Sequence, residues 1–177
     1  MTERALRPLT EEEYLALESS LRHELLEGIP YAMAGAGLDH NLMVTNLAAF
    51  LQPPARAKGC RVYSETVKLK LSQDTFYYPD VMMVCGPKAH PLYETAPCLV
   101  VEVLSPSTEA QDRREKLARY LRLPSLEGYL LLQSETRGGT LYRRTPEGFR
   151  EEALGEVLHL SCLEGSVPVE AIYEGVA

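Results

Sequence analysis

The stretch CLVVEVLSPST, residues Cys98–Thr108, has the pattern of a strand buried inside a sheet. Apolar residues fill both faces of the run, and a Ser-Pro turn closes it. Glu102 is the exception, because an ionised carboxylate costs several kcal/mol to bury without a partner. The stretch therefore predicts a central strand with one acidic group that needs a cation or a proton beside it.

The segment after this strand predicts a crossover. TEAQDRREKLARYLRL, residues 108–123, has the pattern of a helix that starts at the capping residue Thr108. GYLLLQ, residues 128–133, is a further buried strand. A strand, a helix and a second strand in this order form a β-α-β unit, in which the two strands are parallel.

The remaining segments predict a mixed sheet with additions at both ends. A capping box from Thr10 to Glu13 starts a short helix, and a hairpin follows around Glu27-Gly28. The first long helix, from residue 38, is expected to end before Pro53-Pro54. The strand-like runs 60–71 and 76–85 and the run 140–152 predict two more hairpins. We expect an α/β (α+β) fold with a mixed central β-sheet flanked by helices, an N-terminal helix-hairpin and a C-terminal hairpin.

Length and composition indicate one globular domain over residues 1–177. Apolar residues make up 45% of the chain and charged residues 24%. No apolar run reaches the roughly 18 residues of a membrane span, and the charged N-terminus does not resemble a signal peptide, so a cytoplasmic protein is expected. The net charge of −7 argues against broad non-specific nucleic-acid binding but allows a local basic surface.

The four cysteines are expected to be reduced structural thiols. Cys60, Cys85, Cys98 and Cys162 are far apart in the sequence and form no C-x-x-C pair. Reduced thiols are the ordinary state inside cells.

Two strands each carry one acidic residue in apolar surroundings. Asp80 follows Pro79, which removes a donor from the ladder and favours a break that turns the side chain into a cleft. Two carboxylates that converge repel each other unless a cation or a shared proton lies between them. Asp80 and Glu102 therefore predict a site for a hard divalent cation.

A lysine on the crossover helix completes this constellation. From Thr108 to Lys116 the helix rises about 12 Å at ~1.5 Å per residue. From Glu102 to Ser105 the strand extends about 10 Å at ~3.3 Å per residue. Because the helix runs back along the strand, Lys116 is expected beside Glu102, where it can orient or help deprotonate a water and stabilise a phosphorane.

The segments YPD, EVLSPST and DRREKLARY, in this order and spacing, resemble the PD-(D/E)XK nuclease superfamily. More narrowly, nearly the whole chain resembles the bacterial Uma-two family of restriction-endonuclease-like proteins. The resemblance implies a restriction-endonuclease-like core and Mg²⁺-dependent (or Mn²⁺-dependent) hydrolysis of phosphodiester bonds in DNA. It also implies that Asp80 and Glu102 are metal ligands and that the backbone carbonyl of Val103 is a third contact.

The resemblance extends to three further positions. The superfamily lysine falls two residues after the acid, where this chain has Leu104, and the narrower family implies that Lys116 takes its role. Glu24 in HELLEG and His40 before the first long helix match two more polar positions of that family.

Structural interpretations of the same residues stay open. Glu102 and Lys116 can form a buried ion pair without metal, Asp80 can be a turn residue, and His40 can be an ordinary hydrogen-bonded helix residue. The protein would then be a catalytically silent nuclease-fold protein that acts through protein contacts. A phosphodiesterase on a small phosphate ester is a third possibility.

The C-terminal hairpin predicts a homodimer. A short nuclease fold leaves an exposed sheet edge, and Leu141, Tyr142 and Phe149 are apolar residues that a partner chain can cover. A two-fold dimer is the commonest solution.

Overall fold

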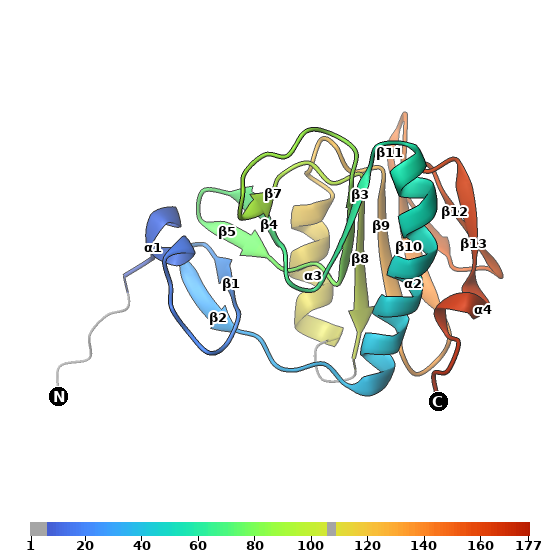
Figure 1. Ribbon diagram of the computed structural model, residues 1–177, viewed down its shortest axis with the longest axis horizontal. Helices are drawn as coiled ribbons and strands as arrows, with labels where there is room; N and C mark the ends of the chain where they lie inside the picture. The colour runs from blue at the N-terminus through green and yellow to red at the C-terminus, as the bar shows by residue number, and fades with distance from the viewer. Residues whose placement is uncertain (1–6, 106–108) are drawn as a thin grey trace.

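The computed structural model describes residues 7–105 and 109–177 (Figure 1). The predicted cap Thr108 lies outside them. Within these residues the helices are α1 (Glu11–Leu15), α2 (Leu38–Ala57), α3 (Glu109–Tyr120) and α4 (Val169–Ile172). The strands are β1 (His23–Leu26), β2 (Ile29–Ala32), β3 (Arg61–Ser64), β4 (Lys68–Ser72), β5 (Thr75–Tyr77), β6 (Val81–Val84), β7 (Tyr93–Glu94), β8 (Leu99–Leu104), β9 (Gly128–Gln133), β10 (Gly139–Thr145), β11 (Gly148–Ala153), β12 (Val157–Leu160) and β13 (Gly165–Pro168).

A six-stranded mixed sheet forms the centre, in the order β11-β10-β9-β8-β6-β3. The predicted buried strand is β8, and all six of its residues are buried. It pairs in parallel with β9 and antiparallel with β6, and α3 connects β8 to β9. The predicted crossover and the α+β class with a mixed sheet flanked by helices are confirmed.

Two helices cover the two faces of this sheet (Figure 1). The residues of β8 alternate between the faces, so Val101 packs in the cluster that contains Leu47 and Leu51 of α2. Val100 packs instead in the cluster that contains Tyr120 of α3. The apolar run on β8 is therefore explained by burial on both sides.

The runs 60–71 and 76–85 were expected to form one hairpin, but each breaks in the middle. Their first and last parts, β3 and β6, pair in the central sheet, whereas β4 and β5 belong to a five-stranded sheet in the order β2-β1-β5-β4-β7. Glu65 has a positive φ of 52° at one break, and its N–H donates to the Asp80 carbonyl at 3.1 Å. Pro79 lacks the N–H that would continue the other strand. The breaks therefore place Glu65 and Asp80 where the two sheets meet.

Helix α2 continues past the point where the sequence predicted its end. It runs to Ala57 and contains both Pro53 and Pro54. Leu51 and Ala55, one turn apart on either side of the prolines, are fully buried in the core. Their packing holds the last turn although two helical donors are missing.

The prediction of four reduced thiols is wrong for one pair, because Cys60 and Cys85 form a disulfide. The antiparallel register of β3 and β6 pairs Arg61 with Val84, so Cys60 and Cys85 come opposite each other one residue further along. The pairing of β3 with β6 brings the two sulfurs together, and the spacing of the cysteines in the sequence does not predict that pairing.

The apolar residues of the C-terminal hairpin each have contacts within their own chain. Leu141 is buried, the ring of Tyr142 stacks on Tyr129, and Arg144 lies over the Phe149 ring at 4.5 Å from its centroid. The expectation that a partner chain covers Leu141 is therefore wrong, whereas Tyr142 and Phe149 are half-buried and the homodimer stays a prediction. The capping box between Thr10 and Glu13 is confirmed. Across the described ranges, every helix is too short or too polar to cross a membrane.

Candidate metal and catalytic site

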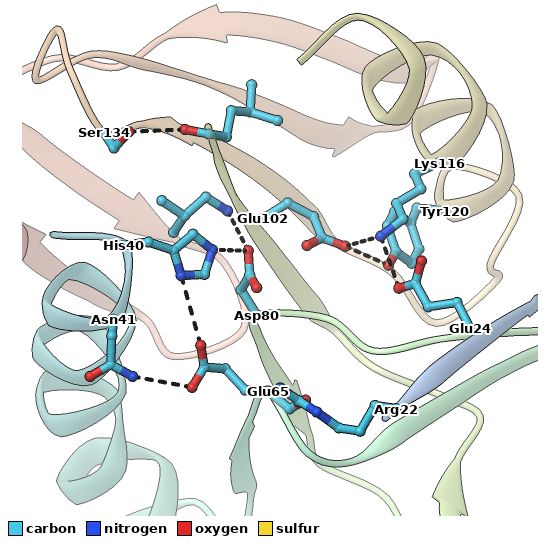
Figure 2. Close-up of polar contacts among 12 residues, drawn as sticks. Arg22, Glu24, His40, Asn41, Glu65, Asp80, Glu102, Lys116, Tyr120 and Ser134 are labelled. Carbon is cyan, nitrogen blue, oxygen red and sulfur yellow. Dashed lines mark hydrogen bonds and ion pairs between the residues drawn. The ribbon is translucent and has the colours of Figure 1, made fainter. Parts of the chain in front are cut away.

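A cleft of about 680 Å³ opens where the two sheets meet. Strands β1 and β8, the residue just before β6, the start of α2 and the middle of α3 each contribute polar side chains to it (Figure 2). The cleft brings together every residue that the sequence singled out, namely Glu24, His40, Asp80, Glu102, Val103 and Lys116.

Asp80 lies at the break before β6 and faces β8. The register that pairs Val81 with Val101 brings Asp80 opposite Glu102 one residue further along, so the two carboxylates converge as expected. Asp80 Oδ2 accepts a hydrogen bond from the Val103 N–H at 2.7 Å. The backbone of Val103 therefore contacts the site through its amide, which holds Asp80 against β8.

His40, in the first turn of α2, connects Asp80 to a residue that the sequence analysis missed. Its Nε2 lies 3.2 Å from Asp80 Oδ2, and its Nδ1 lies 3.7 Å from Glu65 Oε1. Asn41 donates to the other Glu65 oxygen at 3.3 Å. Glu65 sits in a run of strand-like residues, and its position at a strand break, which appears only in the fold, is what turns it into the cleft.

The hydrogen bond to Asp80 raises the pKa of His40, although burial opposes the charged form. The negative charges of Asp80 and Glu65 act in the same direction as the hydrogen bond. His40 therefore holds a proton more readily than a free histidine as long as no other cation lies between these groups.

Lys116 lies where the helix and strand rises placed it. Its Nζ is 3.6 Å from Glu102 Oε1, and its closer partner is Glu24 Oε1 at 2.9 Å. The Tyr77 ring adds a cation–π contact at 5.0 Å from Nζ to the centroid. Glu24 also accepts from the Tyr78 N–H at 3.0 Å, which ties β1 to the start of the break before Asp80.

Tyr120 is a second residue that the sequence analysis missed. It follows Lys116 by one helical turn, and its hydroxyl donates to Glu102 Oε1 at 2.8 Å. The spacing of four residues on one helix was the available signal, because side chains at i and i+4 share a face.

Burial raises the pKa of Glu102 to about 8. The ammonium of Lys116 opposes this shift, and the charges of Asp80 and Glu24 add to it. Glu102 is only 8% exposed and Lys116 only 9%. Without a further cation, Glu102 therefore keeps a proton at neutral pH, which answers how a carboxylate is tolerated inside β8.

The donor atoms around His40 suit a divalent cation. One ligand atom from each of His40, Glu65 and Asp80 lies within 4.8 Å of the other two. His40 Nδ1 is buried and has no hydrogen-bond partner among the described residues. Its 3.7 Å separation from Glu65 is too long for a hydrogen bond but suits two ligands of one ion with bonds of about 2.0–2.3 Å. Glu102 stands outside this group of three and faces Lys116 and Tyr120 (Figure 2).

The chain has a restriction-endonuclease-like fold, with a mixed sheet flanked by helices and a carboxylate-lined cleft where its two sheets meet. Residues 11–167 match the model of the Uma2 family, which is described as "Putative restriction endonuclease". The chain belongs to the Uma2 family.

Two related sequences and one solved structure illustrate what this chain is similar to. "Uncharacterized protein slr1290" of Synechocystis sp. is 33% identical over 177 residues, which cover 96% of this chain and 93% of that protein. "Uncharacterized protein sll1609" of the same organism is 30% identical over 131 residues, or 70% of this chain and 74% of that protein. A crystal structure from Anabaena variabilis, titled "putative nuclease belonging to DUF820", has a TM-score of 0.77 at 16% identity and covers 96% of this chain and 100% of that one. The structural match shows the shared fold.

Proposed function

We propose that the protein is an endonuclease that hydrolyses phosphodiester bonds of DNA with Mg²⁺ or Mn²⁺. The observation that carries the proposal is the buried His40 Nδ1, which faces Glu65 and has no hydrogen-bond partner among the described residues. It lies next to Asp80 in the cleft that also contains Lys116. Membership of the Uma2 family supports this chemistry over other uses of such a cleft.

The ligand set that we propose is wider than the sequence suggested. Asp80 is the shared ligand, because it lies opposite Glu102 and also contacts His40. On one side of the proposed ion, His40 and Glu65 are the further ligands. On the other side, the further ligands are Glu102 and the backbone carbonyl of Val103. Two or more carboxylates match the oxygen preference of Mg²⁺, and an imidazole is also accepted by Mn²⁺.

When bound, the cation supplies a Lewis acid that stabilises negative charge on the phosphate and makes water more acidic. Lys116 has the position to act on the same phosphate or water, since its ammonium is fixed between Glu24 and Glu102. It donates hydrogen bonds to the oxygens on which charge develops, and orients the attacking water. Glu24 and Tyr120 position the Lys116–Glu102 pair without touching substrate.

The direct test is cleavage of supercoiled plasmid and of single-stranded DNA by the purified protein. We expect cleavage with Mg²⁺ or Mn²⁺, no cleavage in EDTA, and no cleavage by Asp80→Asn. Asp74→Asn, the same substitution at an exposed aspartate outside the cleft, is the matched control and should behave as the parent. Equal cleavage by Asp80→Asn and the parent would overturn the proposal.

One observation favours a second candidate, a catalytically silent protein that acts through protein contacts. Lys116 already forms ion pairs with two carboxylates, as a structural lysine would.

A phosphodiesterase on a small phosphate ester shares the proposed site, and hydrolysis of bis(p-nitrophenyl) phosphate without cleavage of DNA would distinguish it. The net charge of −7 is compatible with either candidate.

We also propose one domain per chain and a homodimer, now without the buried Leu141 at the interface. Strand β11 is an edge of the central sheet and β3 is the other edge. Light scattering at micromolar concentration should give twice the mass of one chain, and the mass of one chain would refute the dimer.

A further inference from the structure

All four cysteines of the chain gather at the end of the central sheet opposite the cleft. Cys85 follows β6 and Cys98 precedes β8, the two strands whose other ends carry Asp80 and Glu102. Cys60 precedes β3, and Cys162 lies in the turn after β12. Four segments that are distant in sequence therefore each place one sulfur at the same end of the sheet.

The four sulfurs form a continuous chain of contacts. Cys60 and Cys85 are joined by the disulfide. The Cys98 Sγ lies 3.7 Å from the Cys85 Sγ, and Cys162 is hydrogen-bonded to Cys98. Cys98 is a free thiol, so it is the donor toward the disulfide sulfur.

The four cysteines differ in their exposure to solvent. Cys60 is 5% exposed and Cys98 is 8% exposed, whereas Cys85 is exposed to solvent and Cys162 is half-buried. A thiol or disulfide in solution therefore reaches Cys85 first. Cys98 reaches it only from inside the protein.

We propose that these four cysteines form a thiol–disulfide exchange site in which Cys98 attacks the Cys60–Cys85 disulfide at Cys85. The Cys98 thiolate forms a new bond to Cys85 Sγ while the Cys60–Cys85 bond breaks, and Cys60 leaves as a thiolate that takes up the proton released by Cys98. Cys162 then attacks Cys98 in the same manner and Cys85 leaves. The disulfide migrates from Cys60–Cys85 to Cys98–Cys162 with no net oxidation, so no external oxidant is required.

The hydrogen bond to Cys98, together with burial, raises the pKa of the Cys162 thiol. Cys162 therefore keeps its proton and acts second, after Cys98 has become part of a disulfide. Metal binding by the four sulfurs fits less well, because Cys60 and Cys85 are bonded to each other and cannot both act as thiolate ligands. The exchange site is independent of the function proposed for the cleft.

The first test removes the leaving sulfur. Cys60→Ser protein is treated with oxidised glutathione, whose disulfide is attacked at one sulfur by exposed Cys85 with loss of one glutathione thiolate. We expect Cys98 to displace the second glutathione, so that peptide mass spectrometry finds a Cys85–Cys98 disulfide or the Cys98–Cys162 disulfide that forms from it when Cys162 attacks. The Cys60→Ser, Cys98→Ser double variant should keep glutathione on Cys85. Stable glutathione on Cys85 in the single variant as well would overturn the proposal.

The second test needs no variant and so does not depend on the folding of a mutant. The parent protein is incubated anaerobically for hours, the range of uncatalysed disulfide rearrangement, and then its free thiols are blocked and its disulfides mapped. We expect peptides joined through Cys85–Cys98 and Cys98–Cys162 beside Cys60–Cys85. Cys60–Cys85 as the sole disulfide, with Cys98 and Cys162 fully blocked at every time point, would also overturn the proposal.

Discussion

The cleft has two halves that treat buried charge differently. In the half formed by His40, Glu65 and Asp80, two carboxylates surround an imidazole whose Nδ1 has no hydrogen-bond partner among the described residues. In the half formed by Glu102, Lys116 and Glu24, the chain supplies its own cation at 2.9 and 3.6 Å from carboxylate oxygens. The second half is therefore already neutralised by a lysine, whereas in the first half an imidazole lies between the carboxylates, and the proposed function adds a cation from solution there.

The largest effect is expected where the neutralised half contributes to catalysis. Lys116→Ala should lower DNA cleavage by about 10²–10⁴-fold, the usual range for a general acid–base group. Lys116→Arg should not restore cleavage, because a planar fork replaces a compact charge. Metal affinity should hardly change, since an ammonium is not a ligand. A Lys116→Ala protein that cleaves as fast as the parent would leave the lysine a structural role only.

The next effect distinguishes the roles of Glu24 and Glu102, the two carboxylates that form ion pairs with Lys116. Glu24→Gln removes the closer, largely buried partner and should lower the free energy of unfolding by about 3 kcal/mol. Glu102→Gln should leave the apo protein equally or more stable at pH 8, because burial disfavours the ionised form of Glu102 and Lys116 keeps Glu24. Urea unfolding in EDTA measures both. If Glu102→Gln costs more than Glu24→Gln, the Glu102–Lys116 pair is a structural ion pair.

The half around His40 should respond to metal. Mn²⁺ or Mg²⁺ should raise the melting temperature, since a ligand at about 100 times its dissociation constant adds about 2.7 kcal/mol to stability. Asp80→Asn should abolish this increment, and Glu65→Gln should reduce it. Asp74→Asn should retain it. A melting temperature unaffected by millimolar metal would count against the site.

A further effect is the pH dependence of the free energy of unfolding of the apo protein. Glu102 has a pKa of about 8 in the folded protein and an ordinary value of 4.5, so between these values the unfolded chain releases a proton that the folded chain keeps. His40, whose pKa is raised above 6.5, contributes stability below that value and loses it as the pH rises through its folded pKa. Both groups make stability in EDTA fall as the pH rises from about 5 to 8. Glu102→Gln should flatten this slope, and a parent protein without the slope would contradict the raised pKa values.

The metal-induced increment should change with pH in the opposite direction. His40 and Glu102 must both lose their protons to become ligands, so the increment in melting temperature should grow from pH 6 to pH 8.5. Glu102→Gln should reduce this growth. An increment that is constant with pH would place the ion away from both groups.

Much of the site followed from sequence because it depends on local geometry. Pro79 indicated the break that turns Asp80 into the cleft, and the rises of strand and helix placed Lys116 beside Glu102. Glu65 did not follow, because it enters the site only where a strand-like run splits between two sheets. The hairpin residue Leu141 was expected to be available to a partner chain, and packing within its own chain buries it.

The sequence alone predicted the central strand, the crossover, the mixed sheet with its flanking helices, and the order of the acidic residues along the chain. These features depend on periodicity, proline and residue rise, which act over a few neighbouring positions. Packing between distant segments set the Cys60–Cys85 pairing, the entry of Glu65 into the cleft, and the choice of Glu24 as the closer partner of Lys116. Each of these depends on the register between segments distant in the chain, because only packing and ladder hydrogen bonds set which residues come opposite each other.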